Sequence, residues 1–538
     1  MPPQFIPWTR AARTLSRCLS KRNFSKLLAR RTIHLNNWDK PMKLDRELKF
    51  AIIGGTLVLT YSYMSNYLSS DTIKGIKQFS TTSKPLTTSG IKDNGARENT
   101  VFLLTENEVN SRLRSLEESY FVDRCKGVLR YDVSQLPSNN PIEDSRIEQI
   151  ITLPNEQMQS QEDLYFFGIF DGHGGPYTSA KLSRDLVPYI AYQLGQVYAQ
   201  GNENLTSEAI DEAITQGFLQ LDKDIVETAL GNFFEKPSKE NLIEALPAVS
   251  GACSLLAMYD SNNCSLKVAL AGDSRALLGK VDESGSWTVQ SLTTDQTADN
   301  PAEVQRINSE HPNEPNCVRN GRVLGSLQPS RAFGDYRYKV TELAGKTVYD
   351  LPDHLKIYFR KEPKGLLTPP YVTAKPEITT AQIDRNTRFM VMASDGLFEL
   401  LTNEEIAGLV IKWMEAHPVK KGFNTLKPST KGKIPQVQDL TVDKEFQRPA
   451  FRYKNSKESS SEYLLEDNNV STHLIRNALS GGGDKRYVST LISIPPPKSR
   501  SYRDDLTVTV VFFGDDPNPV HEQLTINKNA TTSITPKL

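Results

Sequence analysis

The chain has 538 residues, and its 64 Lys and Arg residues balance its 64 Asp and Glu residues. A neutral chain has no overall electrostatic field that attracts nucleic acid, so we expect no nucleic-acid partner. The five cysteines are scattered and contain no C-x-x-C pair, which indicates neither a disulfide framework nor a zinc knuckle. The length fits two domains or, as we favour, one large domain with insertions behind a targeting region.

The first segment, residues 1–40, has the composition of a mitochondrial transit peptide. No Asp or Glu occurs from Met1 to Asn37, whereas Arg and Lys recur at a spacing that forms one face of a helix. Leu, Phe and Ile occupy the opposite face, which makes the predicted helix amphipathic. The alternative is a basic arm that binds nucleic acid or a membrane surface, but such an arm needs no apolar face. We therefore expect import into mitochondria.

Residues 50–69 form an uncharged run, which is long enough to cross a hydrocarbon core of roughly 30 Å as a helix. The run predicts a transmembrane or sorting helix in the inner mitochondrial membrane. Its Thr, Ser, Asn and Gly residues lower its hydropathy, so a cleaved or interfacial segment is the alternative. A retained span would place the rest of the chain in the intermembrane space, whereas passage or cleavage would place it in the matrix. Residues 70–100 are polar and predict a linker.

Residues 101–515 predict one α+β domain in which helices cover sheets. Runs rich in aromatic and β-branched residues predict strands at Leu164–Phe170, Cys253–Met258, Leu266–Leu270, Arg388–Ala393 and Leu506–Phe513. Apolar positions spaced by three and four residues predict helices at Ala180–Tyr198, Glu208–Ala229, Glu303–Ser309, Asn403–Met414 and Ser471–Leu479. Residues 420–461 are polar and rich in Lys and Ser, which indicates an insertion.

Residues 516–538 form a predicted C-terminal tail that ends in Pro536-Lys537-Leu538. This tripeptide is similar to the Ser-Lys-Leu signal that the peroxisomal import receptor binds. Peroxisomal delivery is therefore a second hypothesis for the location. Removal of Leu538 from a tagged protein would abolish a peroxisomal signal if the hypothesis is correct.

Short acidic patterns stand beside several of the predicted strands, where a rigid sheet can aim side chains at one point. They are Pro141-Ile142-Glu143-Asp144, Phe170-Asp171-Gly172-His173, Ala393-Ser394-Asp395-Gly396 and Arg503-Asp504-Asp505. An isolated Asp-Gly is more often a turn than a ligand, but the patterns occur together. Carboxylates without Cys or several His select hard cations such as Mg²⁺ or Mn²⁺. Two such ions roughly 3.5–4 Å apart activate a shared water and hold phosphate oxygens for in-line attack, so the patterns predict phosphate hydrolysis.

Six runs together resemble the PPM (type 2C) family of metal-dependent serine/threonine protein phosphatases. They are FDGHGG from Phe170, SGACSLLA from Ser250, AGDSRALL from Ala271, SRAFGD from Ser330, SDGLFELL from Ser394 and RDDLTVTVV from Arg503. The resemblance implies a four-layer α-β-β-α sandwich, with two packed antiparallel sheets flanked by helices. It also implies hydrolysis of phosphoserine or phosphothreonine by a metal-bridged hydroxide. Segments such as LTENEVNSRL and TPPYVTAKPEIT are similar to mitochondrial pyruvate dehydrogenase phosphatases, which implies the E1α subunit of the pyruvate dehydrogenase complex as substrate.

The resemblance implies metal ligands residue by residue. Asp171 is similar to the catalytic aspartate that bridges the two ions, and Gly172 to the neighbour that offers its carbonyl oxygen. The other implied ligands are Glu143 for one ion, Asp395 and Asp504 for the second, and Asp273 for a weaker third ion that some relatives hold. Asp144 and Asp505 are expected to orient their neighbours.

His173 resembles the family's general acid, which protonates the leaving oxygen of the substrate; a structural imidazole is the alternative. Many family members place an arginine four residues before the metal-binding glutamate to clamp the phosphate, and this chain has Asn139 at that substrate-binding position. An amide cannot make the charge-assisted bidentate contacts of a guanidinium. Phosphate binding must therefore depend more on the metals, or on an arginine from elsewhere in the chain.

Three alternatives differ from this reading. A pseudophosphatase that only binds a partner is expected to lose metal carboxylates, whereas Glu143, Asp171, Asp395 and Asp504 are all present. A two-metal hydrolase for nucleic acid lacks support because the charge is balanced and no basic groove pattern occurs. A phosphoprotein of the intermembrane space or the peroxisome is the alternative substrate.

Overall fold

The computed structural model describes residues 102–124, 127–153, 162–199, 206–420, 440–442, 462–514 and 524–532. The predicted transit peptide, the run at 50–69 and the linker at 70–100 lie outside these ranges, as do most of the insertion at 420–461 and the C-terminal tripeptide. Among the described residues, no helix combines the length and the apolar character that crossing a bilayer requires.

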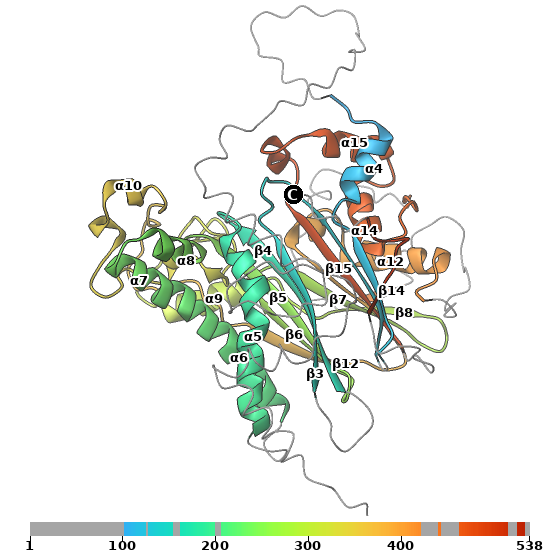
Figure 1. Ribbon diagram of the computed structural model, residues 1–538, viewed down its shortest axis with the longest axis horizontal. Helices are drawn as coiled ribbons and strands as arrows, with labels where there is room; N and C mark the ends of the chain where they lie inside the picture. Colours follow the sequence, from blue (N-terminus) through green and yellow to red (C-terminus); the bar gives the residue numbers. More distant parts are fainter. Residues whose placement is uncertain are drawn as a thin grey trace, which may run out of the picture.

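Two β-sheets form the centre of the molecule, and helices cover the outer face of each (Figure 1). The larger sheet has the strand order β14 (Leu440–Val442), β8 (Trp287–Ser291), β7 (Arg275–Val281), β13 (Thr387–Ala393), β15 (Leu506–Phe513), β2 (Val128–Leu136), β1 (Glu118–Val122) and β16 (Leu524–Ile526). The smaller sheet has the order β12 (Glu377–Gln382), β6 (Ser265–Ala271), β5 (Gly251–Asp260), β4 (Glu162–His173) and β3 (Ser145–Leu153), with β11 (Phe333–Gly334) paired to β5. Neighbouring strands are antiparallel, apart from the parallel pair β14 and β8.

The side chains of β4 show why both faces of a sheet are buried. Successive side chains of a strand point to opposite faces. Tyr165, Phe167 and Ile169 belong to the apolar cluster between the two sheets, whereas Phe166 and Phe170 pack against the helices. Because both faces are covered, the strand has a continuous apolar sequence rather than an alternating one. The predicted α+β sandwich of four layers, α-β-β-α, is therefore confirmed.

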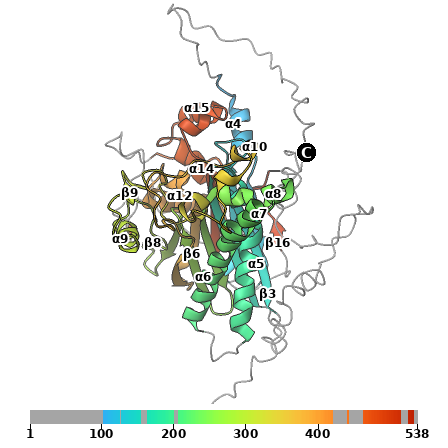
Figure 2. The same ribbon diagram turned by 90° about the vertical axis from the view of Figure 1, so that its left-hand side faces the viewer.

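Helices α5 (Tyr177–Ala199) and α6 (Ser207–Lys223) lie side by side on the smaller sheet (Figure 2). Helices α12 (Asn403–Ala416) and α14 (Val470–Leu479) cover the larger sheet. The other helices are α4 (Glu106–Leu113), α7 (Leu230–Glu235), α8 (Lys239–Val249), α9 (Pro301–Glu310), α10 (Asp353–Lys356), α11 (Asp395–Phe398) and α15 (Lys485–Ser493).

The predicted helix at Glu208–Ala229 is interrupted. It consists of α6 and a π-helical segment, η3 (Asp224–Ala229), which continues into α7. The apolar periodicity therefore predicted a helix correctly, but it did not predict the change of helical type.

The three 3₁₀ turns that the described residues contain are η4 (Tyr336–Tyr338), η5 (Val348–Asp350) and η7 (Lys498–Ser501), and a short hairpin pairs β9 (Val318–Arg319) with β10 (Arg322–Val323).

The end of the domain differs from the sequence prediction, which placed it at residue 515. Strand β16 pairs with β1, where Tyr120 stands opposite Ile526. The chain then continues along the same edge, and the N–H of Asn527 donates to the carbonyl oxygen of Ser119 at 2.9 Å. Part of the predicted tail therefore completes the larger sheet.

Glu117, just before β1, is a buried carboxyl group, and we expect it to make the stability of the protein depend on pH. The residue is 6% exposed, and its carboxylate accepts hydrogen bonds from the hydroxyls of Thr472 at 2.7 Å and Thr532 at 3.1 Å. Burial raises the pKa of Glu117 to about 7. Its protonated form is thus favoured in the folded state, and this stabilisation is present at low pH and is lost as the pH rises towards 7. Between pH 5 and pH 8, we expect the unfolding free energy of the wild type to fall relative to Glu117→Gln by on the order of 3 kcal/mol.

Chemical denaturation at a series of pH values measures this difference. Glu235→Gln is the matched control, because Glu235 is exposed. Parallel pH profiles for the wild type and Glu117→Gln would contradict the prediction.

Candidate active site

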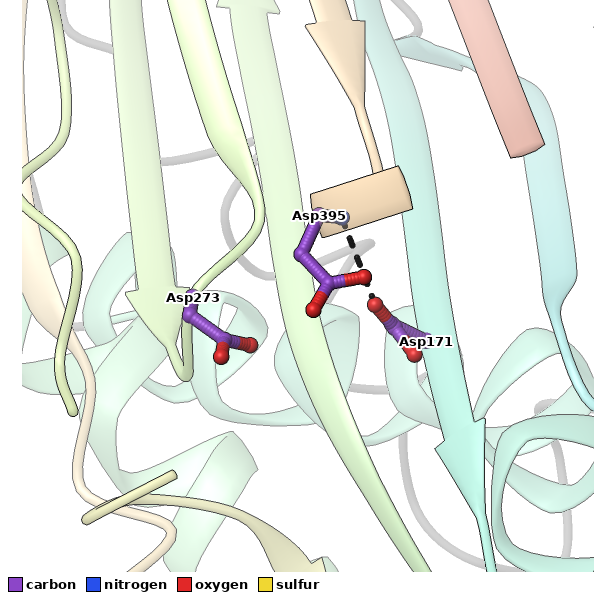
Figure 3. A group of neighbouring side chains, drawn as sticks. All are labelled: Asp171, Asp273 and Asp395. Carbon is purple, nitrogen blue, oxygen red and sulfur yellow. Dashed lines mark hydrogen bonds between the residues drawn. The ribbon is translucent and has the colours of Figure 1, made fainter. Parts of the chain in front are cut away.

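Three aspartates from distant parts of the chain meet where the two sheets face each other (Figure 3). Asp171 lies near the end of β4, Asp273 follows β6, and Asp395 begins α11 directly after β13. Carboxylate oxygens of the three residues all lie within 4.8 Å of one another. The N–H of Asp395 also donates to Oδ2 of Asp171 at 3.4 Å. The structure therefore brings together three of the predicted metal ligands.

A close approach between β5 and the turn after β6 positions Asp273. Gly272 in this turn has a φ of +136°, and an added Cβ would lie 2.3 Å from the Cβ of Cys253. Only glycine allows this approach. Cys253 stands opposite Asp171 in the sheet, and its Sγ donates to Oδ1 of Asp273 at 3.3 Å. Cys253 on β5 thus lies between β4, which carries Asp171, and the turn after β6, which carries Asp273.

The carboxylates of the site repel one another. The pKa of Asp171 is raised well above its ordinary value by burial and by the charge of Asp395. Burial and the same neighbour raise the pKa of Asp504 to about 7. Such a cluster is stabilised when it binds a proton or a cation. Because all its donors are oxygens, it fits a hard divalent cation such as Mg²⁺ or Mn²⁺.

Glu143 and Asp504 are joined by an arginine. Arg500 Nη1 pairs with Oδ1 of Asp504 and lies 3.8 Å from Oε2 of Glu143. The carboxylate of Glu143 also accepts from the N–H of Gly175 at 2.7 Å and from Nδ2 of Asn139 at 3.0 Å. Asn139 therefore lies beside Glu143, and its amide bonds to that carboxylate.

Gly172 allows the loop that carries Glu143 to rest on β4. An added Cβ at Gly172 would lie 2.1 Å from the carbonyl oxygen of Glu143. Asp505 fixes the same loop from the opposite side. Its carboxylate accepts from the N–H of Ser138 at 2.5 Å and from the N–H of Glu143 at 2.8 Å. Asp505 thus acts as an orienting residue, in agreement with the sequence interpretation.

Asp144, the residue after Glu143, is buried, and its carboxylate is hydrogen-bonded to β15 rather than to Asp171, Asp273 or Asp395. Its Oδ2 accepts from Oγ1 of Thr507 in β15 at 2.7 Å. The contact joins the Glu143 loop to the larger sheet and supports an orienting role for Asp144 as well.

His173, at the end of β4, is paired with an aspartate. Its Nε2 lies 2.6 Å from Oδ2 of Asp335, which stands in a turn with a φ of +50°. Burial lowers the pKa of His173, but the charge and the hydrogen bond of Asp335 outweigh this effect, and the net pKa is raised. The pair favours the protonated imidazolium, which is the form that a general acid needs.

The sequence interpretation missed two of these residues. Asp335 ends the run SRAFGD, which was recognised without a role for its aspartate. Arg500 stands four residues before Asp504. Two side chains at this spacing meet only if the chain between them turns. The Asp335 motif was therefore a usable signal, whereas the role of Arg500 needed the structure.

A side chain added at Gly251 is expected to disturb the pair of His173 and Asp335. An added Cβ would lie 2.2 Å from Oδ2 of Asp335 and 2.2 Å from Nε2 of His173. Because the site is closely packed, we expect Gly251→Ala to lower the unfolding free energy by about 1–3 kcal/mol. Denaturant unfolding measures the change.

Gly231→Ala is the matched control, since Gly231 lies in α7 and its added Cβ meets no atom within 4 Å. This change is expected to stabilise the protein by roughly 0.5–1 kcal/mol. Equal stability of Gly251→Ala and the wild type would show that the pair moves freely.

Known proteins are similar to this chain in sequence. Residues 131–430 match the family described as protein phosphatase 2C. The chain is 52% identical to the Saccharomyces cerevisiae protein named pyruvate dehydrogenase (acetyl-transferring)-phosphatase 1, mitochondrial, over 98% of each chain. A Schizosaccharomyces pombe protein phosphatase 2C homologue is 38% identical over 76% of this chain and 85% of its own. The Bos taurus protein with the same name as the Saccharomyces cerevisiae relative is 32% identical over 77% of this chain and 83% of its own.

Proposed function

The chain belongs to the protein phosphatase 2C family and is a serine/threonine protein phosphatase, and on this premise we propose that it dephosphorylates the pyruvate dehydrogenase complex in mitochondria. The observation that carries the chemistry is the convergence of Asp171, Asp273 and Asp395 within 4.8 Å. The names of the Saccharomyces cerevisiae and Bos taurus relatives support the substrate. The E1α subunit is the proposed target.

The carboxylates have the main binding role in this proposal. Asp171 would help to hold two divalent cations, and Glu143 and the carbonyl oxygen of Gly172 would be further ligands of one of them. The proposed ligands of the second ion are Asp395 and Asp504, and Asp273 adds a weaker third position. When bound, the Mg²⁺ or Mn²⁺ ions supply Lewis-acid activation of water and neutralise the phosphate charge.

The remaining residues orient these groups and supply a proton. Asp505 and Asp144 hold the loop of Glu143 in place through their hydrogen bonds. His173 would donate a proton to the serine or threonine oxygen as its bond to phosphorus breaks. Asp335 favours the protonated imidazole, since it raises the pKa of His173, and orients the ring through Nε2. Protonation of the leaving oxygen contributes typically 10²–10⁴-fold to such reactions.

Mitochondrial delivery is also part of the proposal. The amphipathic segment at residues 1–40, which has no Asp or Glu from Met1 to Asn37, supports it, together with the names of the relatives. Anchoring by residues 50–69 and a peroxisomal use of Pro536-Lys537-Leu538 rest on the sequence alone. Protease protection in mitochondria stripped of their outer membrane would distinguish the matrix from the intermembrane space.

Release of phosphate by the full chain tests the proposal. We expect Mn²⁺- or Mg²⁺-dependent hydrolysis of phosphoserine in the E1α subunit, and its loss in EDTA. A phosphoserine peptide of unrelated sequence serves as the comparison. Equal rates on both would leave the phosphatase but reject the assigned substrate, and no metal-dependent release from either would reject the activity.

A further inference from the structure

Arg500 places a cation inside a group of carboxylates. Its Nη1 pairs with Asp504 and lies 3.8 Å from Oε2 of Glu143. The side chain is 37% exposed, so part of it is accessible to solvent while Nη1 contacts the carboxylates. A group that approaches the carboxylates from solvent on this side would meet the guanidinium.

The backbone that carries Arg500 is anchored to the loop of the site. Arg500 lies in η7, where the buried Ser499 donates its hydroxyl to the carbonyl oxygen of Ser138 at 2.5 Å. The N–H of Arg503 donates to the carbonyl oxygen of Ser499 at 3.0 Å, which closes the turn before Asp504. Since Ser138 is bonded to Asp505, the turn and the Glu143 loop form one connected unit. The position of Arg500 relative to the site is therefore set by the fold.

The partners of Arg500 change when the site is loaded. Glu143 and Asp504, once they hold cations, no longer offer a full negative charge to the guanidinium. Arg500 then has unsatisfied donors at the edge of a site that receives a phosphate dianion. The planar fork of a guanidinium matches two phosphate oxygens, and such charge-assisted contacts are among the strong hydrogen bonds in proteins.

We propose that Arg500 binds the phosphate group of the substrate, an inference that rests on the proposed phosphatase activity. Asn139 also contacts Oε2 of Glu143, but it is not an equivalent donor, because a neutral amide has neither the charge nor the planar fork of a guanidinium. In the metal-free protein the same guanidinium neutralises part of the carboxylate repulsion. Arg500 thus exchanges two carboxylates for one phosphate as the site fills.

In an alternative role, Arg500 would only compete with cations for the carboxylates and would not bind phosphate. Both roles predict that Arg500→Ala binds Mn²⁺ more tightly, because a competing positive charge is removed. They differ for phosphate, since only a phosphate-binding residue changes the affinity for that anion. Binding of inorganic phosphate to the Mn²⁺-saturated full chain separates the two roles.

Calorimetric titration with inorganic phosphate is the experiment. We expect Arg500→Ala to raise the Kd for phosphate by about 10- to 100-fold, because hydrogen bonds to charged groups are lost. Arg500→Lys keeps the charge without the fork and is expected to raise the Kd less than Arg500→Ala. Lys498→Ala, which removes an exposed charge from the same turn, is the matched control and should leave the Kd unchanged. Arg360→Ala is the second comparison, since its Nη1 lies 3.3 Å from the ideal Cβ position of Gly174.

An unchanged Kd in Arg500→Ala and Arg500→Lys, or a rise only in Arg360→Ala, would overturn the proposal. Thermal unfolding of each variant identifies a folding defect, and Arg500→Lys carries the test if the alanine variant does not fold. The wild type is assayed on a phosphoserine peptide in parallel. Inactivity of the wild type would reject the proposed function, whereas an active wild type with unchanged phosphate binding in the variants would reject the role of Arg500 alone.

Discussion

Asp171→Asn is expected to lower the rate of phosphoserine hydrolysis by about 1,000-fold or more, because the bridging carboxylate of the proposed metal site loses its charge. The same change should raise the melting temperature of the metal-free protein. The pKa of Asp171 is raised by burial and by repulsion from Asp395, so a neutral amide relieves an unfavourable charge. Mn²⁺ should then stabilise the variant less than it stabilises the wild type, since a ligand at free concentration L that binds only the folded state raises stability by RT ln(1 + L/Kd), which grows as the Kd falls.

Phosphate release and thermal unfolding with and without Mn²⁺ measure these effects. Asp353→Asn is the control, because the Asp353 side chain is 98% exposed on α10. It should change neither the rate nor the response to Mn²⁺. Full Mn²⁺-dependent activity in Asp171→Asn would remove the aspartate from the proposed metal centre.

His173→Gln is expected to lower hydrolysis of a phosphoserine peptide by about 100-fold or more, because the leaving serine oxygen then departs without a proton. Hydrolysis of p-nitrophenyl phosphate should fall much less, since nitrophenolate is stable without protonation. The two substrates therefore distinguish proton donation from a structural role of the imidazole. An equal loss on both substrates would favour the structural role.

Asp335→Asn tests the pair through the pH profile. A general acid must be protonated, so the rate falls as the pH rises through its pKa. The pKa of His173 is lowered by burial but raised overall by Asp335. Loss of the Asp335 charge should therefore move the falling limb of the pH profile to lower pH for phosphoserine peptides, and a limb that stays in place would show that Asp335 does not tune His173.

The strands found from the sequence and those that were missed differ in their charges. The run before Asp171 is apolar on both faces and was predicted correctly. Strand β2 is equally buried but contains Arg130 and Asp132, which pair with each other at 2.7 Å. Charged residues usually indicate an exposed segment. Their burial also depends on a distant part of the chain, because Arg130 donates to the carbonyl oxygen of Asn468 and Asp132 accepts from the N–H of Val470. The sequence pattern of β2 therefore concealed the strand.

The end of the domain was hidden for a related reason. Strand β16 has three residues, too few for a clear alternation of polar and apolar positions. Its stability comes from pairing with β1 at the edge of the larger sheet. A short edge strand of this kind depends on its partner, so its position is not encoded in its own residues.

The amino-acid sequence alone determined the fold class, the family resemblance and the aspartates Asp171, Asp273 and Asp395, which the structure brings within 4.8 Å. The fold class could be predicted because strand and helix periodicity are local properties of the chain, and the family resemblance implied the aspartates because its motifs are short, local runs. Only the tertiary structure decided which side chains complete the site. His173 and Asp335 are 162 positions apart, and Arg500 meets Glu143 only because η7 packs against the loop after β2. Contacts of this kind depend on how the two sheets and their loops pack together, and no local pattern specifies that packing.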